Sequence, residues 1–88
     1  MKNVIIYTSS YCGFCESAKK FLSQKNIPFK TVDLSNDEEL RTKLSLEHNW
    51  RTVPMIFFGD EFIGGFRELV DLTAKGLLDE KLKLDTDS

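Results

Sequence analysis

The chain has 88 residues and a formal net charge of −2 at pH 7, which suits one compact domain with a modest core. Its hydrophobic share of 41% and its mixed charges are those of an ordinary globular protein, and its field is too weak to recruit nucleic acid or acidic lipid. No apolar run approaches the roughly 20 residues of a membrane-spanning helix, and the apolar stretch near the start is too short for a secretory signal. We therefore expect a cytoplasmic protein with neither nucleic acid nor membrane among its partners.

A short apolar, β-branched segment at residues 4–8 predicts a buried strand directly before the two cysteines of the chain, Cys12 and Cys15. Apolar residues then recur at helical spacing until the sequence KNIP at residues 25–28 breaks the pattern. Cys12 is therefore predicted at or just before the N-terminus of a helix. The predicted buried face of this helix consists of Phe14, Ala18, Phe21 and Leu22.

A second strand is predicted over residues 28–34, and the polar run behind it predicts the start of a second helix. Two overlapping capping boxes lie in this run, Ser35 with Glu38 and Asn36 with Glu39. In either box the first side chain would accept a backbone N–H of the first helical turn. The second helix is thus expected to begin directly behind one of these residues.

The segment MIFFGDEFIGG at residues 55–65 reads as two short strands joined at Gly59 and Asp60, which predicts a hairpin. Helical spacing then returns over residues 66–78. Behind it we expect a final turn packed by Leu82 and a frayed, polar end. The predicted buried positions of the third helix are Phe66, Leu69, Leu72 and Leu77.

The predicted order is therefore β-α-β-α-β-β-α. Its first βαβ unit should be a parallel, right-handed crossover, and its terminal hairpin should be antiparallel. The sequence thus predicts an α/β fold with a four-stranded mixed sheet flanked by helices. It forms one domain over residues 1–82, followed by a polar tail at residues 83–88.

The Cys12–Gly–Phe–Cys15 motif could be a structural staple, a metal clip or a redox pair. A staple is disfavoured because the cytosol keeps such thiols reduced and so short a loop gains little from closure. Zinc needs about four ligands, and His48, the other soft candidate, is distant and expected to be a solvated residue on a helix surface. At a helix start, however, unpaired N–H groups and the dipole favour a thiolate, with a thiol pKa in roughly the 3.5–7.5 range. Cys12 is therefore the predicted nucleophile and Cys15 its resolving partner.

A second constellation is the sequence RTVP at residues 51–54, which places a proline where a strand N–H would be expected. The proline is either a trans residue at an ordinary strand start or part of a cis Val53–Pro54 bond. In the cis form the N–H and C=O of Val53 would be free to pair with an extended peptide beside Cys12. The glycine pair at residues 64–65 would then allow a close backbone approach and a helix start that could bind a carboxylate.

Three stretches, IIYTSSYCGFC, RTVPMIFF and FIGGFREL, resemble a glutaredoxin in order and spacing over residues 3–82. The resemblance implies a thioredoxin-like fold, a cis Pro54 and glutathione as the cofactor peptide. The glutathione cysteine would bond to Cys12, its backbone would pair with Val53, and its glycine carboxylate would lie near Arg51. Its γ-glutamyl end would lie over the turn behind Gly65. The glutathione-binding residues that the resemblance implies are Tyr11, Phe14, Arg51, Thr52, Val53, Pro54, Gly65, Phe66, Arg67 and Glu68.

The sequence departs from many glutaredoxins at three places. The Gly-Phe pair at residues 13–14 looks like the Cys-Gly-Phe-Ser loop of the monothiol class with its serine replaced by Cys15, where many members have Pro-Tyr. Ser9 stands where many have a lysine, and Arg67 and Glu68 stand where many have acidic residues. Arg67 would repel the γ-glutamyl ammonium, which Glu68 could hold instead.

The resemblance implies a glutathione-dependent thiol–disulfide oxidoreductase, which reduces protein disulfides and glutathionylated mixed disulfides through Cys12 and Cys15. Two alternatives remain open. Gly-Phe-Arg at residues 65–67 resembles the redoxins that thioredoxin reductase reduces and that donate electrons to ribonucleotide reductase. The Gly-Phe loop resembles glutaredoxins that share a [2Fe–2S] cluster between two protomers, with Cys12 as the protein ligand from each chain and two glutathione thiols. We expect a metal-free monomer that dimerises only if such a cluster is bound.

Overall fold

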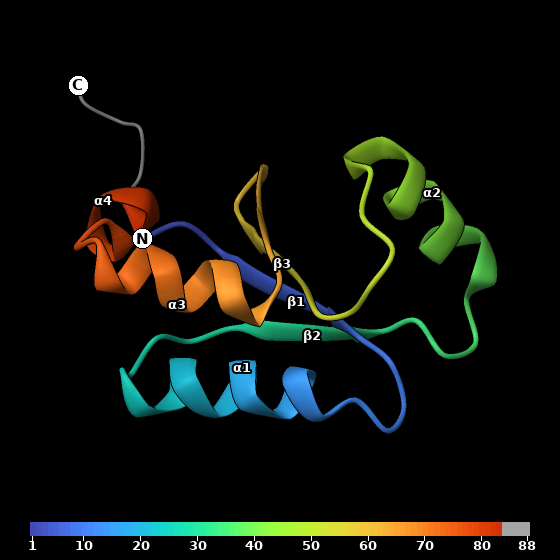
Figure 1. Ribbon diagram of the computed structural model, residues 1–88, viewed down its shortest axis with the longest axis horizontal. Helices are drawn as coiled ribbons and strands as arrows, with labels where there is room; N and C mark the ends of the chain where they lie inside the picture. The colour runs from blue at the N-terminus through green and yellow to red at the C-terminus, as the bar shows by residue number, and fades with distance from the viewer. Residues whose placement is uncertain (84–88) are drawn as a thin grey trace.

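The computed structural model describes residues 1–83, which form one mixed sheet with helices on both faces (Figure 1). The strand order is β2-β1-β3-β4, with β1 parallel to β2 and β3 antiparallel to both β1 and β4. The predicted α/β fold, including its terminal hairpin, is confirmed. The elements are β1 (Val4–Thr8), α1 (Gly13–Gln24), β2 (Lys30–Asp33), α2 (Glu38–His48), β3 (Met55–Phe58), β4 (Glu61–Gly64), α3 (Phe66–Ala74) and α4 (Leu78–Leu82).

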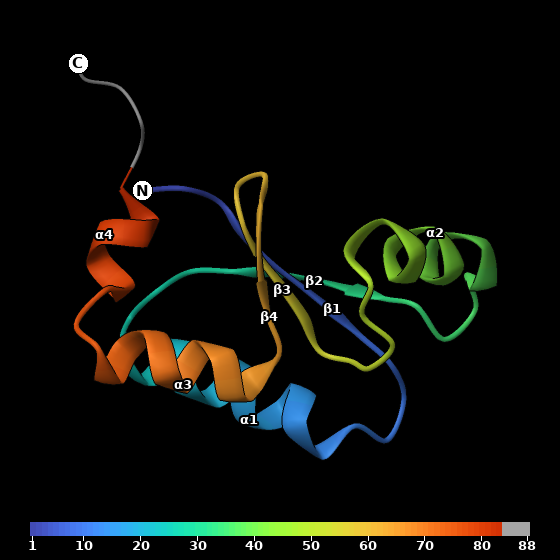
Figure 2. The same cartoon turned by 45° about the horizontal axis from the view of Figure 1, so that its top comes forward.

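Helices α1 and α3 lie side by side against one face of the sheet, and α2 lies on the other (Figures 1 and 2). Strand β3 is buried along its whole length because both of its faces are covered. Its side chains alternate, so Ile56 and Phe58 join one core cluster and Met55 and Phe57 join the other. Among the helices of residues 1–83, none has the length and apolar character needed to cross a membrane.

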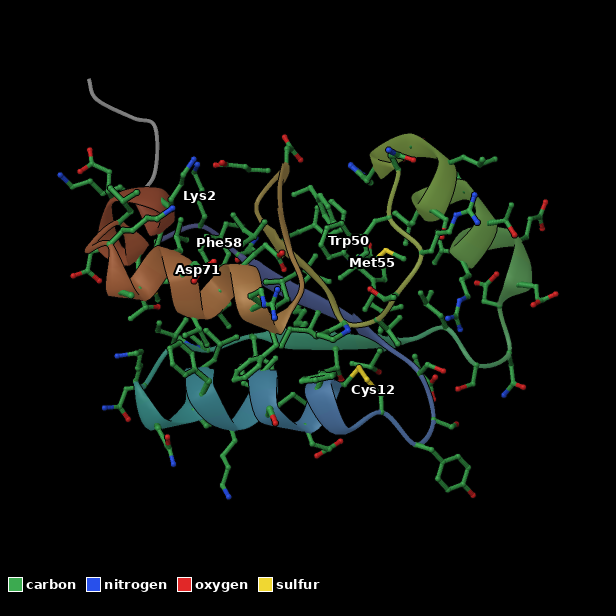
Figure 3. All side chains as sticks on the ribbon, viewed as in Figure 1. Lys2, Cys12, Trp50, Met55, Phe58 and Asp71 are labelled. Atoms are coloured by element: carbon green, nitrogen blue, oxygen red, sulfur yellow. A yellow bond between two sulfur atoms is a disulfide. The ribbon has the colours of Figure 1, made fainter. Side chains whose placement is uncertain are left out.

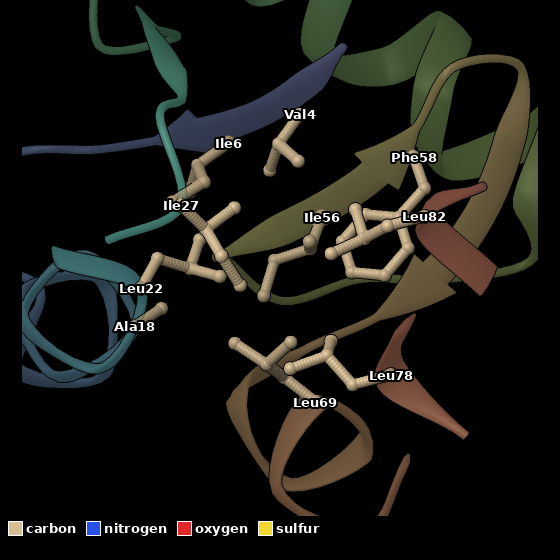
Figure 4. Close-up of a cluster of buried hydrophobic side chains, with 10 residues drawn as sticks. All are labelled: Val4, Ile6, Ala18, Leu22, Ile27, Ile56, Phe58, Leu69, Leu78 and Leu82. Carbon is tan, nitrogen blue, oxygen red and sulfur yellow. The ribbon is translucent and has the colours of Figure 1, made fainter. Parts of the chain in front are cut away.

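The larger core cluster lies between the sheet and helices α1, α3 and α4 (Figure 4). It is built from alternate residues of β1 and β3 and from one face of each helix, as the predicted periodicities require. Burial of this much apolar surface fixes α1 on the sheet, and with α1 the position of its first turn. The cluster consists of Val4, Ile6, Ala18, Leu22, Ile27, Ile56, Phe58, Leu69, Leu78 and Leu82.

The smaller cluster lies under α2, where Leu44 packs with three other buried residues and with half-buried aromatic rings. His48, in the last turn of α2, stacks on Phe62 with ring centroids 4.7 Å apart and meets the edge of Phe57 at 5.0 Å. The prediction of a solvated His48 is therefore wrong. The imidazole is half-buried because the last turn of α2 lies over Phe57 of β3 and Phe62 of β4, whose rings cover part of it.

The N-terminus of α2 differs from both predicted capping boxes. Asp37 is the N-cap residue, and its Oδ1 accepts the backbone N–H of Leu40 at 3.1 Å. Neither predicted box forms, because the chain first makes a turn in which the N–H of Asp37 donates to the carbonyl of Leu34 at 3.2 Å. The hydroxyl of Ser35 is instead bound to Ser10, a residue that the local sequence could not indicate.

The end of α3 also comes earlier than predicted. The helix stops at Ala74, and Gly76 adopts a left-handed conformation with φ of +73° that reverses the chain. Leu77 is consequently exposed rather than buried, which corrects the prediction. The next helix, α4, buries Leu82 as expected, and the carbonyl of Leu82 accepts the N–H of Lys2 at 2.7 Å. The predicted frayed end falls on residues 84–88, which lie outside the described residues.

Candidate active site

The two cysteines lie at the start of α1 and are joined by a disulfide bond (Figure 3). Cys12 is the N-cap residue, with an extended backbone, and its Cα lies 5.2 Å from that of Cys15. The predicted placement of Cys12 at a helix N-terminus is confirmed. Cys15 is only 1% exposed and faces the core, whereas Cys12 is half-buried. A thiolate from outside can therefore reach the sulfur of Cys12 much more readily than that of Cys15.

The surroundings of Cys12 favour its thiolate form. The backbone N–H of Cys15 donates to the Sγ of Cys12 at 3.1 Å, so the sulfur caps the helix in the place of a capping oxygen. The positive end of the helix dipole adds to this donor. The Sγ also lies 3.6 Å from the carbonyl oxygen of Val53, which would accept a thiol hydrogen and so favour the neutral form. The N–H of Cys15 and the helix dipole thus act in favour of the thiolate, and the carbonyl contact acts against it.

The loop before Cys12 is fastened to the connection between β2 and α2. The N–H of Ser10 donates to the Oγ of Ser35 at 2.9 Å, and the two hydroxyl oxygens lie 2.8 Å apart. The N–H of Ser35 donates in turn to Oδ1 of Asp33 at 2.9 Å. Two hydrogen bonds from Ser35 hold the pKa of the Asp33 carboxyl below its ordinary value of 3.8, and the one from the side chain contributes more than the one from the backbone. The loop can then hold Tyr11 in a left-handed conformation, with φ of 57° and its ring fully exposed.

An open groove of about 600 Å³ runs from Phe14 along the residues before β3 to the face of α3. All the predicted glutathione-binding residues line it except Tyr11 and Arg51, which are exposed outside it. Sequence reasoning missed Val70 and Asp71, and it assigned Trp50 to packing, which the structure shows together with a place in the groove wall. Val70 and Asp71 come three and four positions after Arg67 and so share its face of α3, and this helical spacing could have indicated them. The lining residues are Phe14, Trp50, Thr52, Val53, Pro54, Gly65, Phe66, Arg67, Glu68, Val70 and Asp71.

Phe14 is a correction to the predicted buried face of α1. Its side chain is 67% exposed, because the first turn of α1 extends past the part of the helix that contacts the core. The ring lies 6.4 Å from that of Phe66, centroid to centroid, with the planes tilted by 30°. Phe14 therefore forms the wall of the groove next to the disulfide.

The opposite wall of the groove begins with the peptide bond between Val53 and Pro54, which is cis. The sequence left cis and trans open at this position, and the cis form that the family resemblance implies is confirmed. Within residues 1–83, no backbone hydrogen bond uses the N–H of Val53. This N–H and the neighbouring carbonyl are thus available to an extended peptide in the groove.

Gly64 and Gly65 form the junction between β4 and α3. Gly64 has φ of +123°, and a Cβ built on it would lie 2.7 Å from the Cγ of Glu68, so a side chain there would collide. Gly65 is the N-cap of α3, and its N–H donates to Oε1 of Glu68 at 2.9 Å. The carboxylate of Glu68 is therefore folded back onto the start of its own helix. Arg67 is exposed at the rim of the groove.

Trp50 lines the groove and also packs against the smaller core cluster. Its ring packs edge-on against Phe62, with centroids 5.4 Å apart. Its Nε1 is buried and finds no hydrogen-bond acceptor among the described residues. In the same part of the chain, no group of three or more His, Cys, Asp or Glu side chains is arranged to hold a metal ion.

These features define a thioredoxin-like protein with a Cys-x-x-Cys disulfide at a helix start, facing a cis-proline loop. The glutaredoxin family model matches residues 4–63, and the chain belongs to the glutaredoxin family. It is 37% identical to glutaredoxin 3 of Escherichia coli strain K12 over 83 residues, which cover 94% of this chain and 100% of the relative.

Two solved structures agree with this assignment. The solution structure of a glutaredoxin from Brucella melitensis matches with a TM-score of 0.84 at 36% identity, covering 100% of this chain and 96% of that one. A crystal structure of a buckwheat glutaredoxin–glutathione complex matches with a TM-score of 0.85 at 27% identity, covering 90% of this chain and 74% of that one. The resemblance found in the sequence, and the thioredoxin-like fold that it implies, are thus confirmed.

Proposed function

We propose that this glutaredoxin is a glutathione-dependent thiol–disulfide oxidoreductase that reduces glutathionylated mixed disulfides and protein disulfides. One observation supports the proposal above the others: the reachable, N–H-bonded sulfur of Cys12 beside the buried sulfur of Cys15, at the end of an open groove. The buckwheat relative, whose structure contains glutathione, supports the choice of reductant.

With a glutathionylated substrate, the Cys12 thiolate attacks the sulfur of the glutathione moiety. The new bond joins Cys12 to glutathione, and the substrate cysteine leaves as a thiolate that takes a proton from water. A second glutathione, as its thiolate, attacks the glutathione sulfur bound to Cys12 and releases glutathione disulfide. The net reaction converts the glutathionylated substrate and one free glutathione into the reduced substrate and glutathione disulfide. Cys12 returns to its thiolate, which the N–H of Cys15 holds.

With a protein disulfide, the Cys12 thiolate attacks one substrate sulfur and forms a mixed disulfide with the protein. Cys15, as a thiolate, then attacks the sulfur of Cys12, which yields the intramolecular disulfide and frees the substrate as a dithiol. A glutathione thiolate attacks Cys12, the exposed member of the pair, and Cys15 leaves. A second glutathione completes the cycle as before. Only this route requires Cys15.

The groove residues would align glutathione for these steps. The free N–H of Val53 and its carbonyl would pair with the cysteine residue of glutathione, and Thr52 and Pro54 would form the wall behind it. Arg51, exposed next to this wall, would be a weak partner for the glycine carboxylate, because exposed ion pairs contribute about 0–1 kcal/mol. Tyr11 lies outside the groove and could contact only the rim of a larger substrate.

Two cysteine variants test the proposal. Cys12→Ser should abolish turnover of both a glutathionylated peptide and a protein disulfide. Cys15→Ser, its matched control, should keep the reduction of the glutathionylated peptide and lose only the protein disulfide activity. Turnover coupled to glutathione reductase measures both. Retained activity in Cys12→Ser would rule out the proposed nucleophile.

The reductant is tested on the same unaltered protein. Glutathione should reduce the disulfide, and thioredoxin reductase without glutathione should not. The opposite result would favour the alternative in which the protein is a redoxin that thioredoxin reductase reduces and that donates electrons to ribonucleotide reductase. Anaerobic reconstitution with iron, sulfide and glutathione tests the cluster alternative, for which Cys12 is the accessible sulfur of the pair. A brown, glutathione-dependent dimer that Cys12→Ser cannot form would establish it.

A further inference from the structure

The loop of residues 9–11, which leads into Cys12, has a conformation that its own sequence does not favour. Tyr11 has φ of 57°, in the left-handed region that bulky side chains rarely adopt. Its ring is fully exposed, so no buried contact of the ring offsets the cost of this conformation. Cys12 follows with an extended backbone, φ of −110° and ψ of 104°, and its Sγ lies 3.1 Å from the backbone nitrogen of Cys15. The position of the nucleophile therefore depends on what holds this loop.

Ser10 connects the loop to a distant segment, and both of its hydrogen bonds go to Ser35. The N–H of Ser10 donates to the Oγ of Ser35 at 2.9 Å, and the two hydroxyl oxygens lie 2.8 Å apart. Within residues 1–83, no other hydrogen bond joins residues 9–11 to a distant segment. The two serines can meet because each follows the end of one of two parallel, paired strands, β1 and β2. Ser35 is therefore the residue that fixes the loop.

Ser35 is itself held by Asp33. Its N–H donates to Oδ1 of Asp33 at 2.9 Å, and its side chain bonds to the same carboxyl. An ionised carboxyl only accepts, so the hydroxyl hydrogen of Ser35 goes to Asp33, and its oxygen accepts both the N–H and the O–H of Ser10. The hydroxyl bonds then run in one direction, from Ser10 to Ser35 to Asp33. We call these three residues the loop anchor.

We propose, on the basis of the role of Cys12 in the proposed function, that Ser35 is a positioning residue for this nucleophile. Through the loop anchor it keeps Tyr11 in its left-handed conformation. It thereby keeps the Sγ of Cys12 at the N–H of Cys15. That N–H stabilises the thiolate more than the thiol, because hydrogen bonds to ionised acceptors are the stronger ones and weaken steeply when their geometry is lost. Without the hydroxyl of Ser35, the thiolate of Cys12 should therefore form at higher pH.

The test follows the alkylation of reduced protein by iodoacetamide as a function of pH, which needs neither glutathione nor turnover. The thiolate is the reactive form, and Cys12 is the accessible cysteine of the pair. Ser35→Ala should move the midpoint of the pH–rate profile up by about half a unit, as expected for the loss of exposed hydrogen bonds. Ser10→Ala should move it less, because the N–H of Ser10 can still donate to Ser35.

Two variants separate positioning from a general loss of structure. Ser35→Thr keeps the hydroxyl and should restore the profile of the unaltered protein. Ser23→Ala makes the same exchange as Ser35→Ala at an exposed position near the other end of α1, and this matched control should leave the profile unchanged.

A double variant tests whether Ser35 acts through Tyr11. Asparagine adopts the left-handed conformation more readily than tyrosine, so the loop of Tyr11→Asn protein depends less on the anchor. The shift caused by Ser35→Ala should therefore be smaller in the Tyr11→Asn background. A moved midpoint reports the position of the sulfur, because no variant adds or removes a charge. All of them keep the ionisable side chains of the neighbouring segments, which are Glu16, Asp33, Asp37 and Arg51.

Four results would each overturn the inference. They are an unmoved midpoint in Ser35→Ala, a rate lowered by the same factor at every pH, the same shift in Ser35→Thr, and an undiminished shift in the Tyr11→Asn background. Protein that fails to turn over with glutathione, but whose midpoint moves as expected in Ser35→Ala, would refute the proposed function and still support the inference. The two failures are therefore distinguishable.

Discussion

The two faces of the sheet are built from the same strands but are covered very differently. On the face under α1, α3 and α4, residues such as Ile6 and Phe58 are fully enclosed. On the other face α2 provides the helical cover within the described chain, and Tyr7, Trp50 and Phe62 stay half-buried. The nucleophile is fastened to the well-covered face through α1, while Trp50 and Val53 of the groove wall belong to the thinly covered one. We therefore expect the nucleophile to be held more rigidly than the part of the groove wall that Trp50 and Val53 form.

The largest expected effect comes from the well-covered face. Phe58→Ala removes a side chain that is 0% exposed, and the cavity should lower the free energy of unfolding by about 3–5 kcal/mol. Urea denaturation followed by far-UV circular dichroism measures this change. A loss below about 1 kcal/mol would mean that the cluster can collapse around the cavity and is not rigid.

On the thinly covered face, Phe62→Ala should cost less, about 1–2 kcal/mol, because the ring is half-buried and its contacts with His48 and Trp50 are partly open to water. The same change should weaken glutathione binding, since it removes support from Trp50 at the groove. Denaturation and thiol titration are measured on one sample. If Phe62→Ala cost as much as Phe58→Ala, the difference between the faces would disappear.

The attachment of α2 gives a smaller effect. Asp37→Ala should lower the free energy of unfolding by about 1 kcal/mol through the lost cap on Leu40. Asn36→Ala, one residue earlier and exposed, is the matched control and should change stability by less than about 0.5 kcal/mol. A larger loss of stability in Asn36→Ala than in Asp37→Ala would instead support the predicted capping box of Asn36 with Glu39.

The smallest effect is the pH dependence of the loop anchor at Asp33. Because hydrogen bonds from Ser35 lower the pKa of the folded carboxyl below 3.8, its ionised form stabilises the fold at pH values above 3.8. This stabilisation is lost as the pH falls from that value through the folded pKa. Urea denaturation should therefore distinguish Asp33→Asn from the unaltered chain at pH 7 but hardly at the acid end. A difference that grew toward acid pH would have the wrong sign.

Much of the site could be predicted because its signals are local. The cysteine spacing, the proline of residues 51–54 and the hairpin at Gly59 each depend on a few neighbouring residues. The residues of RTVP favoured a cis Pro54 without excluding the trans form, and the family resemblance implied the cis form as well.

The errors concern contacts between distant segments. Ser35 has the side chain of an N-cap, but a residue 25 positions earlier binds its hydroxyl. The environment of His48 depends on Phe57 and Phe62 of the β3–β4 hairpin, and the sequence of α2 gives no sign of these contacts. Leu77 fitted the helical period and was still wrong, because Gly76 makes a left-handed turn that a periodicity count ignores.

Trp50 has a consequence for optical spectroscopy. It is the single tryptophan of the chain, and it borders both the groove and the aromatic rings under α2. Its indole N–H is shielded from solvent and finds no acceptor in the described part of the molecule, so the ring is an indole in an apolar environment whose emission shifts when that environment becomes polar. One fluorescence signal, without any attached dye, therefore reports both the entry of a charged peptide into the groove and the loosening of α2 from the sheet.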